Sequence, residues 1–409
     1  MKVCGIICEF DPFHGGHKHL LDSVRSELGA DAVVCVMSGD FTQRGASASE
    51  DKYHRAAAAV RGGADLVLEL PAAYAVNGAS VFARGGIGIL SGLGFVDAIA
   101  FGSESGDAEG LKRAAALLAS ESGAFSARVK ELSASGLSYQ QSYSAAAAEL
   151  GIDFFSGASP NDMLACEYLK EAASIGFSPE VFCVKRLGTG HADEGEPDFL
   201  SGSSIRKAIA SSGGLADALE TVRRLRDALP DASLPLLGSL RAWEGDGEDA
   251  KRLFSVIQYL LVSRGAAALA SAPSCSEGLE NRIMKAARSA SSFEDLADAA
   301  SGPRYSKSRV RRCLIQALLG IERGLTEDPS MLYARPLAFG ERGAELLRTA
   351  SGSSKIPVFT NLNKNVPEDS PCRPLLQADV RAADVYSILT ERKLYDGSDL
   401  TCNPFFLRV

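Results

Sequence analysis

The fold of this chain is decided near its start, by the stretch Val3-Cys4-Gly5-Ile6-Ile7-Cys8-Glu9-Phe10-Asp11-Pro12-Phe13-His14-Gly15-Gly16-His17. Its first six residues form a continuous apolar run, which is typical of a strand buried on both faces of a sheet. The two glycines then allow a tight turn and a close approach of the backbone to a ligand. A helix that begins near Gly16 or His17 would direct its N-terminal dipole to the same place, so the stretch predicts an anion site.

Four more apolar runs of strand length follow, at Ala32 to Met37, Asp65 to Leu70, Val96 to Phe101 and Val181 to Val184. Segments with helical spacing separate them, among them Gly16 to Leu28, Lys52 to Arg61 and Asn161 to Ala173. This alternation predicts an α/β fold, a doubly wound parallel sheet covered by helices on both faces. Ligands of such sheets bind beyond the carboxyl ends of the strands, so the chemistry is expected at that edge.

The sequence pattern changes near residue 230, where Leu229-Pro230 and Pro235 interrupt the chain and strand-like runs become scarce. We therefore expect a domain boundary there. The prediction is a Rossmann-like sheet domain over residues 1–230 and a mainly helical domain over residues 231–409. The apolar residues from Val310 to Ile321 follow helical spacing and support the second assignment.

Composition limits the possible environments of the protein. The 409 residues carry a net charge of −8, with 46% hydrophobic and 23% charged residues, which is typical of a soluble globular protein and argues against whole-molecule attraction to nucleic acid. Nine cysteines without a Cys-x-x-Cys pair indicate neither a zinc knuckle nor a disulfide framework, so a cytoplasmic protein is expected. We find no run that is apolar for long enough to span a bilayer and expect no membrane contact. The sequence does not fix the oligomeric state.

His14 and His17 are the first candidates for chemistry. Imidazoles can donate hydrogen bonds to a phosphoryl group that gains negative charge. As spacing alone the motif is short, and a turn with two exposed histidines explains it equally well, but its position after the first strand favours phosphate binding. Ser201 to Arg206 joins a hydroxyl-rich helix opening to an arginine, which fits an ordinary helix cap or, beside the histidines, a second phosphate clamp.

Other polar residues follow the predicted strands. Lys185-Arg186 ends one strand and precedes a glycine-rich loop at 188–191, which places a cation on the expected ligand edge. Asp40, Gln43 and Arg44 follow the second strand and can reach a substrate there. Lys52 and Arg55 lie one helical turn apart, and for them a solvated helix face is the better interpretation.

Several strings carry a resemblance to known proteins. The histidine stretch resembles the HxGH signature of the nucleotidyltransferase superfamily. Val36 to Gly45, Gly63 to Pro71 and Phe101 to Glu104 resemble the tRNA(Met) cytidine acetate ligase family. This similarity covers nearly the whole chain and includes Gly278 to Arg282 and Asp379 to Ser387.

The resemblance implies a reaction in two steps. Acetate and ATP give acetyl-adenylate and pyrophosphate, and the acetyl group then passes to N4 of the wobble cytidine of elongator tRNA(Met). The implied catalytic residues are His14, His17 and Arg206. The implied ATP contacts are Ile7, Cys8, Glu9, Phe10, Asp11, Pro12, Phe13, His14, Gly15, Gly16, His17, Lys18, His19, Leu20, Gly102, Asn161, Arg186, Ser203 and Ser204. No dedicated metal-ligand pattern is evident, so Mg²⁺ is expected to come with the nucleotide.

In the second predicted domain, five cations follow one another with no acid between them: Arg304, Lys307, Arg309, Arg311 and Arg312. A charge run is usually a solvated face. In a chain that resembles a tRNA-modifying family, it is the candidate for contact with the phosphate backbone, extended by Arg282, Lys285 and Arg288. Tyr305 within it is a candidate for stacking on a base.

The chain departs from the family pattern at a few positions. Asp11 and Gly15 stand where asparagines are usual, and Ala46-Ser47 where Glu-Pro is usual. The charge of Asp11 would repel a carboxylate or phosphate unless a cation pairs with it. Two other functions remain open from the residues alone, a small-molecule adenylyl- or cytidylyltransferase of coenzyme metabolism and a non-catalytic RNA-binding protein.

Overall fold

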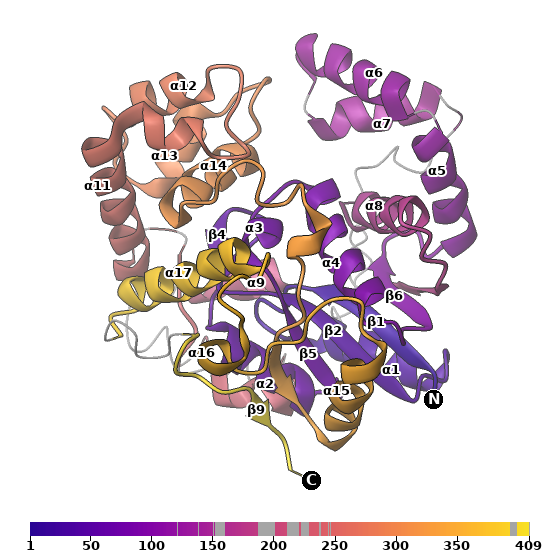
Figure 1. The fold of residues 1–409 in the computed structure, drawn as a ribbon. Coiled ribbons are helices and arrows are strands. Elements are labelled where there is room, and N and C mark those ends of the chain that lie inside the picture. The colour runs from indigo at the N-terminus through magenta and orange to yellow at the C-terminus, as the bar shows by residue number, and fades with distance from the viewer. Residues whose placement is uncertain are drawn as a thin grey trace.

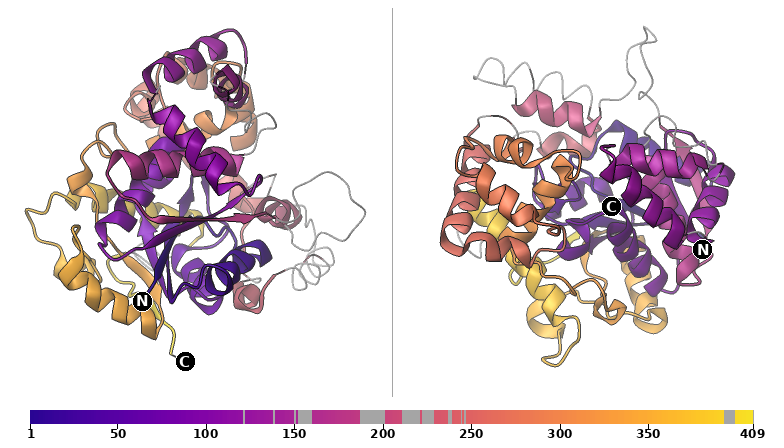
Figure 2. Two further views of the ribbon diagram at one scale, coloured as in Figure 1. Left: turned by 90° about the vertical axis from the view of Figure 1, so that its right-hand side faces the viewer. Right: turned by 90° about the horizontal axis from the view of Figure 1, so that it is seen from above.

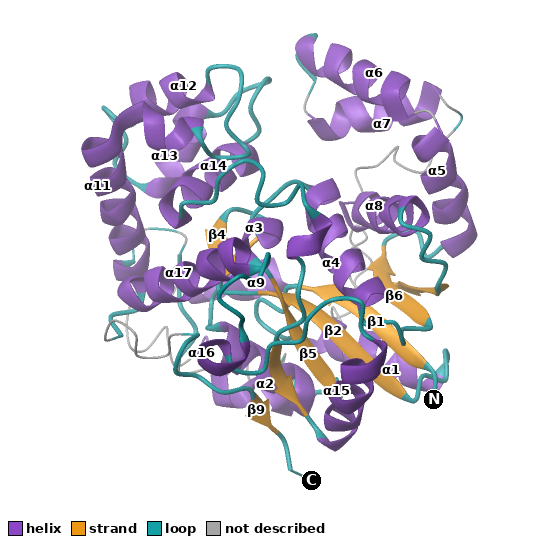
Figure 3. Cartoon of the chain, in the orientation of Figure 1, coloured by secondary structure: helices purple, strands orange, loops and turns teal. Residues whose placement is uncertain are grey.

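A mixed sheet lies at the centre of the computed structural model (Figures 1 and 3). The structure describes residues 1–120, 122–137, 139–149, 151, 160–186, 201–210, 221, 229–236, 239–243, 245, 247–392 and 399–408. Within this part of the chain the sheet has seven strands in the order β7-β6-β1-β2-β5-β8-β9. Their bounds are β1 Val3–Cys8, β2 Ala32–Ser38, β5 Leu66–Leu70, β6 Ala98–Ser103, β7 Glu180–Lys185, β8 Pro336–Phe339 and β9 Phe405–Phe406.

The winding of the chain reverses beside β1. The first crossover runs from β1 through α1 (Gly15–Ser26) to β2 and continues to β5, whereas β6 and β7 lie on the other side of β1. Strands β7, β6, β1, β2 and β5 are all parallel to one another. The fold is therefore the predicted doubly wound sheet, and it opens a crevice where the carboxyl ends of β1 and β6 diverge.

Helices cover both faces of the sheet, as the continuously apolar strands predict. On one face, α1 and α2 (Lys52–Arg61) pack on Ile6, Val33 and Cys35. On the other face, α4 (Ala79–Gly92) and α15 (Glu341–Ser353) pack on the alternate strand positions, which include Val34 and Val36. The two layers are seen from the side in Figure 2.

Most of the remaining helices form two groups beside the carboxyl edge of the sheet (Figure 1). One group consists of α5 (Ala108–Ser120), α6 (Ser122–Ala134), α7 (Tyr139–Glu149) and α8 (Pro160–Ser174). The other, here called the helical group, consists of α11 (Glu248–Ala270), α12 (Leu279–Ala286), α13 (Phe293–Ala300) and α14 (Lys307–Leu319). The shorter elements and the last long helix are β3 Phe41–Thr42, β4 Ala46–Ser47, α3 Ala72–Ala75, α9 Gly202–Ala210, η2 Asp231–Leu236, η3 Pro329–Met331, α16 Leu362–Asn365 and α17 Arg373–Leu389.

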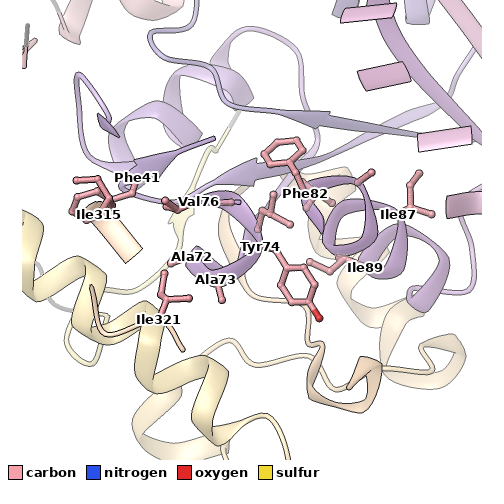
Figure 4. Close-up of a cluster of buried hydrophobic side chains, with 14 of the residues drawn as sticks. Phe41, Ala72, Ala73, Tyr74, Val76, Phe82, Ile87, Ile89, Ile315 and Ile321 are labelled. Atoms are coloured by element: carbon pink, nitrogen blue, oxygen red, sulfur yellow. The ribbon is translucent and has the colours of Figure 1, made fainter. Parts of the chain in front are cut away.

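The helical group shares a core with the sheet layer. Ile315 of α14 belongs to the same buried cluster as Phe41 and Val76, and Figure 4 shows these side chains together. The Nε2 of Gln316 also donates a hydrogen bond of 2.6 Å to the carbonyl of Val76. Because α14 is fixed by this core, its N-terminal half forms a wall beside the crevice.

The second half of the chain returns to the sheet, which differs from the predicted division at residue 230. β8 pairs antiparallel with β5, and β9 pairs with β8. These strands have four and two residues, too few for their pattern to stand out in the sequence. A boundary near Asp231 stays a prediction, but the sheet layer is built from both sides of it.

By length and composition, helix α11 contradicts the prediction that no run of the chain is apolar for long enough to span a bilayer. It is the one helix in the described part of the chain that is long and apolar enough to cross a membrane, and 28% of the relevant window is buried. One such helix is weak evidence of a span. The backbone also leaves helical geometry at Gly265 (φ 61°, ψ −156°), and Leu253 and Ile257 pack into the core.

Candidate active site

A cleft of about 590 Å³ lies at the predicted position, beyond the carboxyl ends of β1 and β6. Most residues that the sequence assigned to ATP or catalysis line it: Ile7, Cys8, Glu9, Phe10, Asp11, His14, Gly16, His17, His19, Leu20, Gly102, Asn161, Arg186, Ser203 and Arg206. The β1–α1 stretch and the more distant residues around Gly102, Asn161, Arg186 and Arg206 thus meet in one place. This convergence of five chain segments is the structural basis of the site.

The remaining predicted residues are not among those that line the cleft: Pro12, Phe13, Gly15, Lys18 and Ser204. Phe13 is fully buried below the cleft, with its ring centre 5.9 Å from that of His17. Lys18 faces solvent and pairs with Asp22 at 2.5 Å. The backbone N–H of the exposed Ser204 donates to Ser201 Oγ at 3.1 Å. This hydrogen bond is the one expected of an ordinary helix cap.

His14 and His17 form a reciprocal cap at the start of α1. The Nδ1 of His14 accepts from the backbone N–H of Gly16 at 3.1 Å, and the Nδ1 of His17 accepts from the backbone N–H of His14 at 3.3 Å. The two rings are stacked, with centres 3.7 Å apart. A neutral imidazole whose Nδ1 accepts must carry its proton on Nε2, so both rings keep an Nε2–H donor for a ligand.

The surroundings of the two rings keep them neutral. Burial and the nearby Arg186 lower the pKa of His14 to about 4. Burial, then His14 and Arg186, hold the pKa of His17 well below its ordinary value. At neutral pH both side chains are therefore hydrogen-bond donors without net charge.

The two carboxylates of the cleft are already engaged. Glu9 Oε1 accepts from the backbone N–H of Gln43 at 2.7 Å and from Ser38 Oγ at 3.2 Å, and burial raises the pKa of Glu9. Asp11 Oδ1 accepts from the backbone N–H of Ser49 at 2.7 Å and from its hydroxyl at 2.6 Å. Asp11, which stands where asparagine is usual, is also paired with a cation, since its Oδ2 lies 3.5 Å from Arg206 Nη1.

Two arginines supply positive charge to the cleft. Arg206 Nη1 donates to the carbonyl of Asp11 at 2.5 Å, which fixes α9 to the β1–α1 stretch. Arg186 lies against Gly102, where an added Cβ would be 3.3 Å from its Cγ. Among the described residues the buried Nε of Arg186 has no hydrogen-bond partner, so this guanidinium retains donor capacity for a ligand. The loop predicted at 188–191 lies outside the described residues.

The sequence missed the contribution of α14 to this cleft. Ser308 and Arg312 line it together with Gln43 and Arg44 from the turn between β3 and β4. Arg312 Nη1 donates to the carbonyl of Gln43 at 3.2 Å. A Cβ at Gly45 (φ 72°) would lie 2.4 Å from the backbone N of Arg312, so this close packing requires glycine. Gly45 and the cation run at 304–312 are both visible in the sequence. They are far apart along the chain, however, and no local pattern shows that they pack together.

The other cations of α14 meet acids from neighbouring elements. Lys307 Nζ lies 3.0 Å from Glu294 and 2.6 Å from Asp298, and Arg311 also pairs with Glu294. Arg309 donates to the carbonyl of Ser274 at 3.1 Å and to Ser276 Oγ at 2.5 Å. Arg304 is the most exposed of the five, with 67% of its side chain accessible and Glu277 at 3.6 Å.

The expectation that Tyr305 stacks on a base is wrong for this structure. Its side chain is only 6% exposed, and its hydroxyl donates to the carbonyl of Glu277 at 2.5 Å. The guanidinium groups of Arg282, Arg304 and Arg309 lie 5.3–6.0 Å from its ring centre. The ring is thus a buried support for these cations.

The expectation of a solvated face for Lys52 and Arg55 is also wrong. Both are fully buried. Lys52 Nζ lies 2.6 Å from Glu69 Oε1 and 2.7 Å from Asp399 Oδ2, while Arg55 Nε donates to the carbonyl of Glu50 at 2.9 Å. The acids that pair with Lys52 come from distant parts of the chain, so local spacing gave no sign of them.

Comparison with known proteins narrows the class. The family model described as HIGH Nucleotidyl Transferase matches residues 1–399. The tRNA(Met) cytidine acetate ligase of Clostridium perfringens is 32% identical over 422 residues, covering 100% of both chains. That of Caldanaerobacter subterraneus is 35% identical over 397 residues, covering 95% of both. The crystal structure of Thermotoga maritima TmcAL bound with alpha-thio ATP superposes with a TM-score of 0.85 at 28% identity, covering 100% of both chains.

The doubly wound sheet, the cleft at its switch point and the paired histidines are those of a HIGH-type nucleotidyltransferase. Within that class the similarity extends over the full length, including the helical group. The chain belongs to the tRNA(Met) cytidine acetate ligase family.

Proposed function

We propose that this protein is an ATP-dependent ligase that acetylates the wobble cytidine of elongator tRNA(Met). The observation that carries the proposal is the cleft, where two neutral imidazole donors at a helix N-terminus face the same space as Arg186 and Arg206. The relatives named for this activity match over their full length, which favours it over a coenzyme transferase or a non-catalytic protein.

In the first step, a carboxylate oxygen of acetate attacks the α-phosphorus of ATP. The bond from this phosphorus to the bridging oxygen breaks, and pyrophosphate leaves with the electron pair. Negative charge builds up on the non-bridging oxygens, so positioned donors lower the barrier more than any covalent group would. In the second step, the cytidine N4 amine attacks the acetyl carbon, and AMP leaves with the carboxylate's former oxygen while the amine loses a proton.

His14 and His17 serve as donors to the reacting phosphate in this proposal. Their Nε2–H groups are free of the helix cap, and the N-terminal dipole of α1 adds to their effect. Because both rings stay neutral, they polarise the phosphate without a proton transfer. Arg186 and Arg206 neutralise the charge that passes to the departing pyrophosphate.

Magnesium would come with the nucleotide in this scheme. Glu9 is held by Gln43 and Ser38, and Asp11 by Ser49 and Arg206, so neither carboxylate of the described cleft lining offers a free pair of oxygens. The donor set therefore fits a cation bound mainly by phosphate oxygens and water rather than a protein cage.

The helical group is the proposed tRNA-binding region. Arg304, Lys307, Arg309, Arg311 and Arg312 gather on and before α14, whose N-terminal half also forms the cleft wall. This position would bring a bound nucleotide base close to the adenylate. A cytoplasmic location fits the free state of all nine cysteines, as expected in a reducing compartment.

The decisive test is incubation of the protein with ATP, isotopically labelled acetate and elongator tRNA(Met), followed by mass spectrometry of the nucleosides. Labelled N4-acetylcytidine is expected only when all three substrates are present. Omission of the tRNA should leave acetate-dependent ATP–pyrophosphate exchange. Absence of both exchange and labelled nucleoside with the folded protein would reject the proposal.

A further inference from the structure

A second, much smaller cavity of about 20 Å³ adjoins the nucleotide cleft. Asp11, Arg44 and Arg206 line both spaces, so the cavity lies next to the place proposed for the phosphates. It is enclosed on the far side by β4 and the helical group. No role has been assigned to this space by the ATP contacts described above.

The accessible surface of the cavity walls is mostly carbon, although Thr42, Arg241 and Glu294 also line it. Ala46, Trp243, Leu253 and Phe293 supply the apolar part. Trp243 and Phe293 are buried, and the indole N–H of Trp243 is used by the carbonyl of Ala48 at 2.6 Å. These walls therefore present carbon surface to whatever occupies the space.

Two polar atoms of residues that line the cavity have no hydrogen-bond partner in the part of the chain that the structure describes. Ser47 is 2% exposed, and its Oγ makes no hydrogen bond within the described part of the chain. The Nε of Arg311 is likewise buried without a partner. Buried polar atoms are nearly always paired, so two unpaired donors around one small space indicate that a ligand or water belongs there.

The mouth of the cavity is positively charged. Asp11 is compensated by Ser49 and Arg206, whereas Arg44 makes no hydrogen bond or ion pair with any residue that the structure describes. Arg44 also lies close enough for its charge to lower the pKa of Glu9. A free guanidinium at the junction of the two spaces suits a carboxylate that must face the α-phosphate.

We propose that this cavity is the acid subsite, which holds the methyl group of acetate while Arg44 holds its carboxylate at the mouth. The inference rests on the proposed function and adds the residues that select the acid. About 20 Å³ admits roughly one group of the size of water or methyl. The subsite therefore accepts a two-carbon acid and excludes the extra methylene of propionate.

The test measures acetate- and propionate-dependent ATP–pyrophosphate exchange in the wild type and two variants. The wild type should prefer acetate in kcat/KM by about 10- to 200-fold, the discrimination expected for one methylene. Ala46→Val adds two methyl groups to the wall and should raise the KM for acetate about tenfold, with the Kd for ATP unchanged. Phe293→Ala enlarges the space and should raise the ratio of propionate to acetate use about tenfold.

Ala127→Val, an exposed alanine of α6, is the matched control and should change neither acid preference nor ATP affinity. Ala46 lies half-buried in a strand, where valine is well tolerated, so this variant decides the question even if Phe293→Ala fails to fold. A KM for acetate within twofold of wild type in folded Ala46→Val overturns the subsite. Failure of acetate to support exchange in the wild type instead overturns the proposed function.

Discussion

The cations of the core and the cation Arg186 of the cleft differ in whether the fold has paired them. In the core, Lys52 and Arg335 share the carboxylates of Glu69 and Asp399, with Arg335 Nη1 2.8 Å from Glu69 Oε2. At the cleft, the Nε of Arg186 has no partner within the described chain. The first set joins α2, β5 and the C-terminal residues, whereas the second is left to bind a ligand.

The pKa values follow the same division. Burial alone would raise the pKa of Asp399, but Arg335 and Lys52 lower it to about 2. Burial raises the pKa of Asp40 to about 6 although Lys52 opposes it at 3.9 Å. At the cleft, no acid among the described residues pairs with Arg186, and its charge lowers the pKa of both histidines. Paired cations stabilise ionised acids, and the unpaired one disfavours further positive charge.

The largest effect is expected from breaking the paired set. Asp399→Asn removes one carboxylate that Lys52 and Arg335 share and should lower the free energy of unfolding by about 3–5 kcal/mol. Urea unfolding monitored by circular dichroism measures it. The exposed Arg44→Gln variant is the control and should unfold like the wild type. A loss below about 1 kcal/mol for Asp399→Asn would mean that the network is not a structural joint.

The next effect concerns the cleft. His14→Asn retains a side-chain oxygen that can accept from Gly16 and cap α1, but it lacks the Nε2–H donor. Acetate-dependent pyrophosphate exchange should fall by about 10²–10³-fold, the usual cost of one lost donor to a reacting group. Thermal unfolding at pH 7.5 should remain near that of the wild type. Exchange that stays within threefold would remove His14 from the proposed chemistry.

The sequence predicts those features whose cause is local. The apolar run Val3 to Cys8 and the helix Lys52 to Arg61 are confirmed with the same bounds, because strand hydrophobicity and alanine-rich helix propensity act over short distances. The position of His14 and His17 directly after β1 also predicted correctly that they lie in the cleft. β8 was missed because a four-residue strand carries too little pattern.

Ion pairs between residues that are distant along the chain could not be predicted from the sequence. The lysine at position 52 meets Asp399, 347 residues further along the chain. The α14 cations looked unopposed because their acids lie on α13 and before α12, in Glu294, Asp298 and Glu277. Charge runs in a sequence show where cations are, but only the tertiary structure shows which of them are available.

Arg186→Gln tests the unpaired set directly. Hydrogen bonds to charged groups contribute about 1.5–3 kcal/mol, so the Kd for ATP should rise about 10- to 100-fold. Calorimetric titration with ATP measures this change. Stability should be unaffected because no buried pair is lost, and the exposed Arg113→Gln of α5 should change neither quantity. A destabilised Arg186→Gln would show that this cation is structural after all.

The lowered pKa of His14 predicts a pH dependence of stability. The ordinary pKa near 6.5 falls to about 4 on folding, so between these values the unfolded chain binds a proton that the folded chain does not. Stability is then complete above pH 6.5 and decreases as the pH falls towards 4, by about 1 kcal/mol per pH unit for this one group. Urea unfolding from pH 7.5 to 5 should show a shallower decrease in His14→Asn than in the wild type. Equal slopes would show that His14 titrates normally in the folded protein.

The smallest effect separates paired from unpaired cations within the helical group. Lys285 at the end of α12 is exposed and has no acidic partner in the described chain, whereas Lys307 is held by Glu294 and Asp298. If tRNA phosphates contact this group, Lys285→Gln should weaken binding and reduce the slope of log affinity against log salt by about 1, as for the loss of one phosphate contact. Lys307→Gln should change the slope far less, because its charge is already compensated in the free protein and its release would cost the two ion pairs.

Filter binding of elongator tRNA(Met) from 50 to about 200 mM salt compares the two variants over a range in which phosphate contacts are visible. Equal losses in both would mean that tRNA displaces the acids of α13, and that pairing in the free protein does not determine which cations of the helical group bind RNA.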